Sequence, residues 1–165
     1  MSNKFFLEND LQKLVGTNLT KIRRMSDMIG FDFERSNTGK TNFKFSIHCE
    51  CSCRLIKDSN VYIGNLDIYE PNENLGFCED YNWDVSGANL FDEKAEKLNK
   101  YLTEKITFVS DVQLSCCKDL KISLTNNIYI EIFSNSSSNH ENWVYFTRDL
   151  RTIYYSIGSD DITRL

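Results

Sequence analysis

Residues 43–54 alternate between apolar and polar side chains without a break. A β-strand turns successive side chains to opposite faces, so this pattern predicts one long strand with one row of side chains against the core. The apolar row consists of Phe43, Phe45, Ile47, Cys49, Cys51 and Cys53, and the polar row of Lys44, Ser46, His48, Glu50, Ser52 and Arg54.

A period of two recurs in most of the remaining chain, and turn residues separate the segments that show it. Asn126 and Asn127 suit the tight type I′ turn of a hairpin. Apolar residues at helical spacing predict an N-terminal helix closed by Gly16, and a second helix over residues 90–103 with Asn89 as its N-cap. The predicted strands are Leu19–Met25, Met28–Arg35, Val61–Tyr69, Ile106–Cys116, 120–124, 128–132, 143–147 and 152–157.

Strands that are joined mostly by short turns indicate antiparallel pairing, because a parallel sheet needs crossover helices. The expected fold is therefore α+β, a mainly antiparallel β-sheet of about eight strands with an N-terminal helix and one central amphipathic helix. A chain of 165 residues with 41% hydrophobic content fits a single domain over residues 1–165.

The segment Asp58–Glu93 contains nine carboxylates and neither Lys nor Arg, whereas the whole chain has 24 acids and 19 bases. The segment carries a formal charge of −9 and the rest of the chain +4, so the net charge of −5 is local. The sequence predicts an irregular loop over residues 71–90, and loops of that length are usually functional or disordered. The rings among its acids favour an ordered loop that packs on the sheet.

We interpret the acidic segment as a docking surface for a basic protein, with charge for solubility as the alternative. Aromatic rings supply buried anchors in interfaces, and carboxylates supply steering and specificity. Asp92 and Glu93 are left out because they favour the dipole of the second helix. The candidate partner-binding residues are Asp67, Tyr69, Glu70, Glu73, Phe77, Glu79, Asp80, Tyr81, Trp83 and Asp84.

The polar row of the 43–54 strand gives a secondary candidate surface. Its functional groups lie on one face of the expected strand, where they either line a groove or are solvated, with Glu50 near Arg54. The residues of this surface are His48, Glu50, Ser52 and Arg54.

Other chemistries are disfavoured by spacing. Cysteines two residues apart lie about 6.6 Å apart along a strand, too far for easy zinc chelation, so we expect core cysteines and no metal. His48 points away from those thiols and His140 lies in a polar loop, so neither favours a Cys–His nucleophile pair. Glu79, Asp80 and Asp84 lack the scaffold of a general acid and base and the spacing of a calcium loop.

Composition narrows the class of protein further. A pI near 5.1 argues against binding of nucleic acid, which needs positive charge. The start MSNKFFLENDLQK lacks an apolar run long enough for a signal peptide, and no apolar stretch is long enough for a membrane helix. We therefore expect a cytoplasmic protein with six reduced cysteines, no cofactor and no membrane partner.

A shared pattern runs through segments 14–16 with 19–22, 27–33, 47–55, 119–122, 130–133 and 141–143. In these segments the chain resembles a family of small bacterial proteins found beside secreted polymorphic toxins. That family usually has His-Ile-Gln-Cys-x-Trp-Arg in its central strand, and here Cys49, Glu50 and Cys53 replace its Ile, Gln and Trp. The resemblance spans most of the chain and carries no catalytic residue.

The resemblance implies an immunity protein, which is a cytoplasmic antitoxin that protects the producing cell. Together with the segregated charge, it leads us to expect a non-enzymatic protein that covers a cognate toxin through the acidic, aromatic surface. The toxin is expected to have a basic face, such as the cleft in which a nuclease binds its anionic substrate. Two alternatives remain open: a small hydrolase using a polar groove around His48, and a homo-oligomeric structural protein.

Overall fold

The computed structural model describes residues 2–35, 43–75, 80–138, 140–147 and 153–165. No helix within these residues is long and apolar enough to span a membrane. The helices are α1 (Asn3–Gln12), α2 (Leu90–Glu104) and the short 3-10 helices η1 (Asn65–Ile68) and η2 (Glu73–Leu75). The strands are β1 (Asn18–Met25), β2 (Met28–Arg35), β3 (Phe43–Cys49), β4 (Ser52–Lys57), β5 (Asn60–Gly64), β6 (Val109–Leu114), β7 (Leu120–Leu124), β8 (Ile128–Phe133), β9 (Glu141–Thr147), β10 (Tyr154–Gly158) and β11 (Ile162–Arg164).

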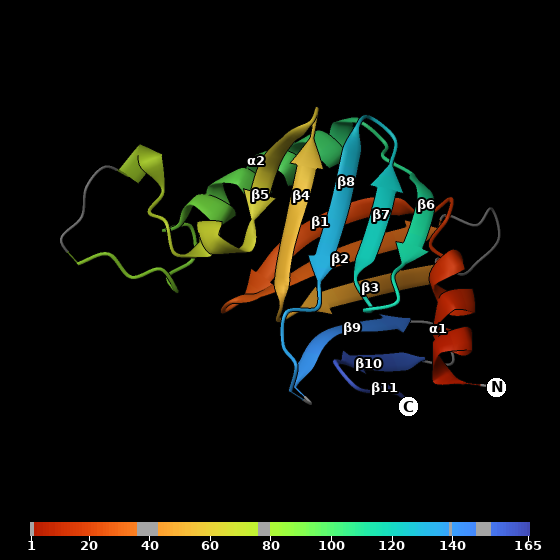
Figure 1. Ribbon diagram of the computed structural model, residues 1–165. Helices are drawn as coiled ribbons and strands as arrows, with labels where there is room; N and C mark the ends of the chain where they lie inside the picture. Colours follow the sequence, from red (N-terminus) through yellow and green to blue (C-terminus); the bar gives the residue numbers. More distant parts are fainter. Residues whose placement is uncertain (1, 36–42, 76–79, 139, 148–152) are drawn as a thin grey trace.

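The strands form two antiparallel sheets that share one core. One sheet has the order β1-β2-β3-β9-β10-β11, and the other has the order β5-β4-β8-β7-β6. The strands of one sheet run across those of the other (Figure 1), as in orthogonally packed sandwiches. The mainly antiparallel α+β fold with two α-helices is confirmed, and the described residues hold eleven strands where the sequence predicted about eight.

Alternating side chains of both sheets build the core. Phe31, Ile47 and Tyr145 come from the first sheet, Ile122 and Ile130 from the second, and each is at most 1% exposed. The expected hairpins also form. Asn126 and Asn127 take left-handed φ angles of 63° and 56°, but they lie in a three-residue connection, since Leu124 pairs with Ile128, and not in the predicted two-residue turn.

The segment 43–54 is two strands rather than one. The chain turns a corner at Glu50 and Cys51, where both backbone N–H groups donate to the C=O of Asn142, at 2.9 and 3.1 Å. β3 belongs to the six-stranded sheet and β4 to the five-stranded sheet, so the predicted single strand was wrong. Burial still alternates through the corner, because both sheets face the same core.

Three element boundaries also differ from the sequence expectation. The strand predicted over Val61–Tyr69 ends at Gly64 and continues as η1, and β6 is shorter than Ile106–Cys116. α1 ends at Gln12, so Gly16 does not close it. Gly16 instead takes a φ of 82° and donates its N–H to the Val109 C=O at 2.8 Å, which joins the start of β1 to β6.

Helix α2 closes one open side of the sandwich, where it packs against the edge strands β1 and β5. Asn99 on α2 accepts from the Ile22 N–H and donates to the Ile22 C=O, both at 2.8 Å. The side-chain amide thus imitates a neighbouring strand and satisfies backbone groups that an edge leaves unpaired.

Helix α1 closes the opposite side, against the edge strands β6 and β11. Gln12 donates to the Val112 C=O of β6 at 3.0 Å, and Asn3 donates to the Ile162 C=O of β11 at 2.7 Å. The buried carboxylate of Asp10 accepts from the Tyr155 hydroxyl at 2.5 Å, so α1 is also fastened to β10.

The central position of β8 leads to a stability prediction. Ile130→Ala should lower the free energy of unfolding by about 3 kcal/mol, because Ile130 is fully buried and its truncation leaves a cavity between the sheets. Urea unfolding followed by circular dichroism measures this loss. Val61→Ala is the control on the edge strand β5, where the side chain is 56% exposed and the expected change is within about 0.5 kcal/mol. Equal losses in the two variants would contradict this account of the core.

Candidate partner-binding surface

Most of the acidic segment lies in a loop with a closed neck. The Leu90 N–H donates to the Glu70 C=O, and the Asn72 N–H donates to the Ala88 C=O, both at 2.8 Å. We call residues 69–89 the acidic loop, of which the structure describes all but residues 76–79. The loop projects from the body of the molecule at the left of Figure 1.

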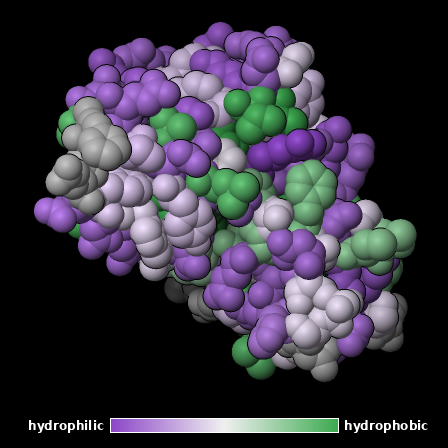
Figure 2. Space-filling view, turned by 60° about the vertical axis from the view of Figure 1, so that its left-hand side comes forward, coloured by the Kyte–Doolittle hydropathy of each residue, from purple (hydrophilic) through white to green (hydrophobic). Residues whose placement is uncertain are grey.

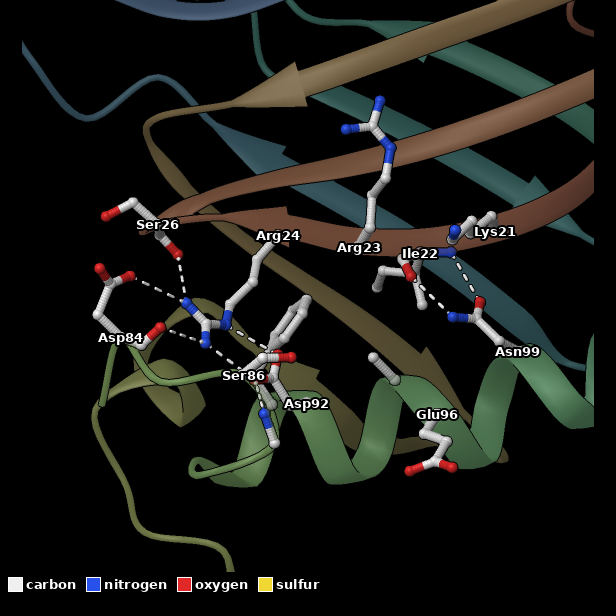
Figure 3. A pocket seen from close by; sticks show the side chains of 13 residues that line it. Lys21, Ile22, Arg23, Arg24, Ser26, Asp84, Ser86, Asp92, Glu96 and Asn99 are labelled. Atoms are coloured by element: carbon white, nitrogen blue, oxygen red, sulfur yellow. Dashed lines mark hydrogen bonds and ion pairs between the residues drawn. The ribbon is translucent and has the colours of Figure 1, made fainter. Parts of the chain in front are cut away.

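Arg24 fastens the acidic loop to the sandwich. Its side chain is 7% exposed, and its Nε and Nη2 donate to the two carboxylate oxygens of Asp92 at 2.8 and 2.9 Å. Nη2 also donates to the backbone C=O groups of residues 83–85, at 3.3 to 3.4 Å. Nη1 lies 3.3 Å from the Asp84 carboxylate and donates to the Ser26 C=O (Figure 3). The hydrogen bond with Asp92 raises the pKa of Arg24, which keeps the guanidinium charged.

Asn89 joins the acidic loop to α2. Its Oδ1 accepts from the Asp92 N–H and its Nδ2 donates to the Trp83 C=O, both at 2.8 Å. The predicted N-cap is therefore confirmed. Because the same fully buried side chain holds the loop, the start of the helix and the loop are fixed together.

Ion pairs neutralise part of the acidic segment. Asp67 pairs with Lys94 at 3.1 Å and accepts from the Gly64 N–H, so it serves η1 and α2. Glu93 pairs with Lys97, whose hydrogen bond lowers the pKa of Glu93. Asp67 is therefore less available to a partner than its place in the sequence suggested.

Other carboxylates of the acidic loop face solvent. Glu70, Glu73 and Asp80 are exposed, and none of them forms an ion pair with a residue that the structure describes. Asp84 remains 56% exposed beside Arg24. Glu79, another predicted site residue, lies outside the described part of the chain.

Apolar side chains lie among these acids. Tyr69, Leu75 and Val85 are 45%, 65% and 54% exposed. Leu75 and Val85 line a hollow of about 170 Å³, together with Pro71 and Tyr81. In Figure 2, which turns the left side of Figure 1 toward the viewer, green apolar groups lie between purple hydrophilic ones.

Contacts hold the rings in the described part of the acidic loop in place. Trp83 is half-buried against the core and meets the ring of Tyr69 edge to face, with centroids 5.1 Å apart. The Tyr81 hydroxyl donates to the Ile68 C=O at 3.5 Å, and burial raises the pKa of Tyr81. The expected ordering of the loop by ring packing holds for Trp83, whereas Phe77 lies outside the described residues.

A groove of about 540 Å³ runs between β1 and α2, beside the attachment of the acidic loop. Arg24 and Asn99 point across it to the partners described above, and Arg23 leaves β1 on the other side (Figure 3). Both charge signs line the groove, with Lys21 and Glu96 as further members. Neither His nor Cys is among its described lining residues, so the groove offers no thiol or imidazole nucleophile.

The secondary surface is divided by the corner at Glu50. His48 lies on β3 in one sheet, whereas Ser52 and Arg54 lie on β4 in the other. Arg54 pairs with Glu131 at 2.7 Å, rather than with Glu50. Because the four polar residues do not share one strand, the predicted row along one strand face was wrong.

His48 lies in a network on the outer face of the six-stranded sheet. The Arg23 guanidinium lies 2.8 Å from the His48 Nε2 and pairs with Asp32 at 2.9 Å. A guanidinium only donates, so Nε2 accepts and the ring carries its proton on Nδ1. Gly30 makes room for this contact, since a Cβ there would lie 3.2 Å from the His48 ring.

The cysteines of the corner behave as core residues. Cys49, Cys51 and Cys53 are buried, and burial raises the pKa of the Cys51 thiol to about 12. Groups of three or more His, Cys, Asp or Glu arranged to hold a metal ion are not found among the described residues.

Comparisons of the chain with protein-family models, with curated proteins and with solved structures found no match.

Arg24 was not among the predicted site residues, although the alternation of side chains along β1 indicates that it points inward. Arg24 follows the buried Ile22 by two residues, so it lies on the same row of β1 as a core side chain. A cation in such a position needs a carboxylate partner. The sequence gives no sign that this partner is Asp92, 68 residues away.

The role of Arg24 can be tested with Arg24→Lys. We expect a loss of about 2 kcal/mol in unfolding free energy, because an ammonium cannot span both oxygens of Asp92 and the loop carbonyls. Hydrogen exchange of the Asn72 N–H, which donates to the Ala88 C=O in the neck of the loop, should also become faster. Arg54→Lys is the matched control, since Arg54 has a similar pair with Glu131 but is 44% exposed, and should lose less than about 1 kcal/mol. An Arg24→Lys variant as stable as the parent would rule out this anchoring role.

Proposed function

We propose that this protein is a cytoplasmic, immunity-type binding protein that neutralises a cognate bacterial toxin by covering it, without catalysis. The acidic loop is the contact surface in this proposal. The observation that carries it is the combination of exposed apolar side chains, carboxylates without ion pairs among the described residues, and a hollow of about 170 Å³ on one anchored loop.

The anchoring of the loop favours tight binding. A flexible loop loses conformational entropy when it binds, whereas a preorganised loop avoids much of that cost. The neck bonds at Glu70 and Asn72, together with the contacts of Arg24, hold residues 70–72 and 83–90 in place before a partner arrives. The hollow beside Leu75 and Val85, of about 170 Å³, then has room for one apolar side chain of the partner.

The exposed carboxylates, which form no ion pair with a described residue, favour a partner with a basic face. Glu70, Glu73 and Asp80 are exposed on one loop, so their negative charges add to one local field. Such a field steers a basic protein and is screened by salt. A toxin that acts on an anionic substrate such as nucleic acid has the required basic surface.

Charge reversal tests the electrostatic part of the proposal. The triple variant Glu70→Lys, Glu73→Lys, Asp80→Lys should lower the association rate with the toxin by at least about tenfold at low salt, since steering becomes repulsion. The toxin is identified by affinity capture from the producing strain, and rates are measured with purified partners over a salt series.

The matched control for charge reversal alters three exposed carboxylates outside the acidic loop: Glu8→Lys, Asp160→Lys and Glu104→Lys. It has the same net charge as the loop variant and should change the association rate by less than about threefold. If the loop variant binds no more slowly than this control, the acidic loop is not the contact surface.

The hollow gives a second, independent test. Leu75→Ala should weaken toxin binding by at least about tenfold, mainly through faster dissociation, because it removes a wall of the hollow. Leu165→Ala is the control, as Leu165 is 79% exposed at the C-terminal end. Both variants should keep the stability of the parent within about 0.5 kcal/mol. Unchanged dissociation of Leu75→Ala would exclude the hollow from the interface.

A further inference from the structure

The turn between β6 and β7 carries two adjacent thiols, Cys116 and Cys117. Both residues are exposed, and their Sγ atoms lie 3.8 Å apart within hydrogen-bond distance. The other described cysteines, Cys49, Cys51 and Cys53, are buried. Only one pair of thiols in the described part of the chain is thus both accessible and close together.

Hydrogen bonds to Ser115 fix the backbone of this turn. Ser115 Oγ accepts from the N–H groups of Cys117 and Asp119, at 3.1 and 3.0 Å. The Lys118 N–H donates to the Ser115 C=O at 3.2 Å, and Lys118 takes a left-handed φ of 67°. The backbone that carries the two thiols is therefore held in one conformation, in which their Sγ atoms lie side by side.

The same turn connects the two sheets. Lys118 Nζ donates to the C=O groups of Gly158 and Ser159, at 2.9 and 2.6 Å. The Lys118 C=O accepts from the indole N–H of Trp143 at 3.0 Å. A chemical change at the neighbouring cysteines therefore acts on a contact between β9, β10 and the other sheet.

We propose that Cys116 and Cys117 are a modification site, at which exchange with a low-molecular-weight disulfide of the glutathione type forms a reversible vicinal disulfide. This assignment is independent of the proposed toxin binding. It rests on the exposure of both thiols, on their separation of 3.8 Å and on the braced turn.

The thiol–disulfide exchange proceeds in two steps. One cysteine loses its proton and attacks a sulfur of the small disulfide, whose S–S bond breaks and releases one half as a thiolate that takes up a proton. The second cysteine then loses its proton, attacks the protein sulfur of the mixed disulfide and releases the other half in the same way. The two cysteines together lose two electrons and two protons, and the small disulfide becomes two thiols.

Local geometry makes this disulfide a labile one. Adjacent Cα atoms are about 3.8 Å apart, whereas the Cα atoms of ordinary disulfides lie about 4.4 to 6.8 Å apart. The ring that closes between neighbouring residues is therefore strained, and strained or exposed disulfides are reduced more easily than structural ones. Excess thiol should return the pair to its reduced form, as a reversible modification requires.

Mass spectrometry of the full-length protein tests the proposal. The experiment uses Cys78→Ala as the parent, because Cys78 lies outside the described residues. After treatment with oxidised glutathione, the folded parent should lose the mass of two hydrogens, and a digest should locate the link between residues 116 and 117. Excess reduced glutathione should restore the original mass.

Variants that keep only one of the two cysteines distinguish formation of the vicinal disulfide from addition of a single glutathione half. In the same background, Cys116→Ser and Cys117→Ser each keep one exposed thiol and should stop at the mixed disulfide, with the mass of one glutathione half added. Both substitutions are at exposed positions, and circular dichroism checks that the variants fold. If the parent also retains a glutathione half, or does not react, the vicinal disulfide is excluded.

The buried cysteines provide an internal control. Cys49, Cys51 and Cys53 are buried, so a small disulfide in solution does not reach them, and burial also raises the pKa of the Cys51 thiol to about 12. Cys49, Cys51 and Cys53 should therefore remain unmodified while the pair in the turn reacts. Modification of a buried cysteine before the exposed pair would contradict the site assignment.

Discussion

Two packed sheets have four edge strands, and each edge leaves backbone N–H and C=O groups that need partners. In this protein α2 covers β1 and β5, and α1 covers β6 and β11. Side-chain amides complete the closure, as Asn99 does when it pairs with both backbone groups of Ile22. Because α2 is fixed in this way, its first turn is held in a defined position against the sandwich. The attachment of the acidic loop to that turn, through Arg24 and Asp92, depends on it.

Local patterns predicted the strands well because burial alternates along them wherever they lie. The same alternation is the reason why the corner at Glu50 could not be predicted. Cys49, Cys51 and Cys53 are all buried, although Cys49 ends a strand of one sheet and Cys53 belongs to the other. Since both sheets face a single core, the alternation continues across the bend and hides it. Asn89, by contrast, acts within one helical turn, so its capping role could be predicted from the neighbouring residues alone.

The candidate surface was only partly predictable, because charge counted along a sequence ignores partners that fold next to it. The acidic segment contains no cation of its own, yet Arg24 reaches Asp92 and Asp84 from β1, and Lys94 reaches Asp67 from α2. These contacts turn some acids into structural groups. What remains for a partner is a smaller set of exposed carboxylates beside Leu75 and Val85. The proposed interface therefore depends on shape as well as on charge.

The corner and the turn with the paired thiols belong to one cluster of contacts. Asn142 accepts the N–H groups of the corner, and its side chain donates to the Ser159 hydroxyl at 3.3 Å. Lys118 donates to the C=O of the same Ser159 and accepts from Trp143, the next residue of β9. Oxidation in the turn would therefore strain the point where the chain crosses between sheets. Its effect should appear first in the stability of the sandwich, because Arg24 and Asn89 hold the acidic loop through separate contacts.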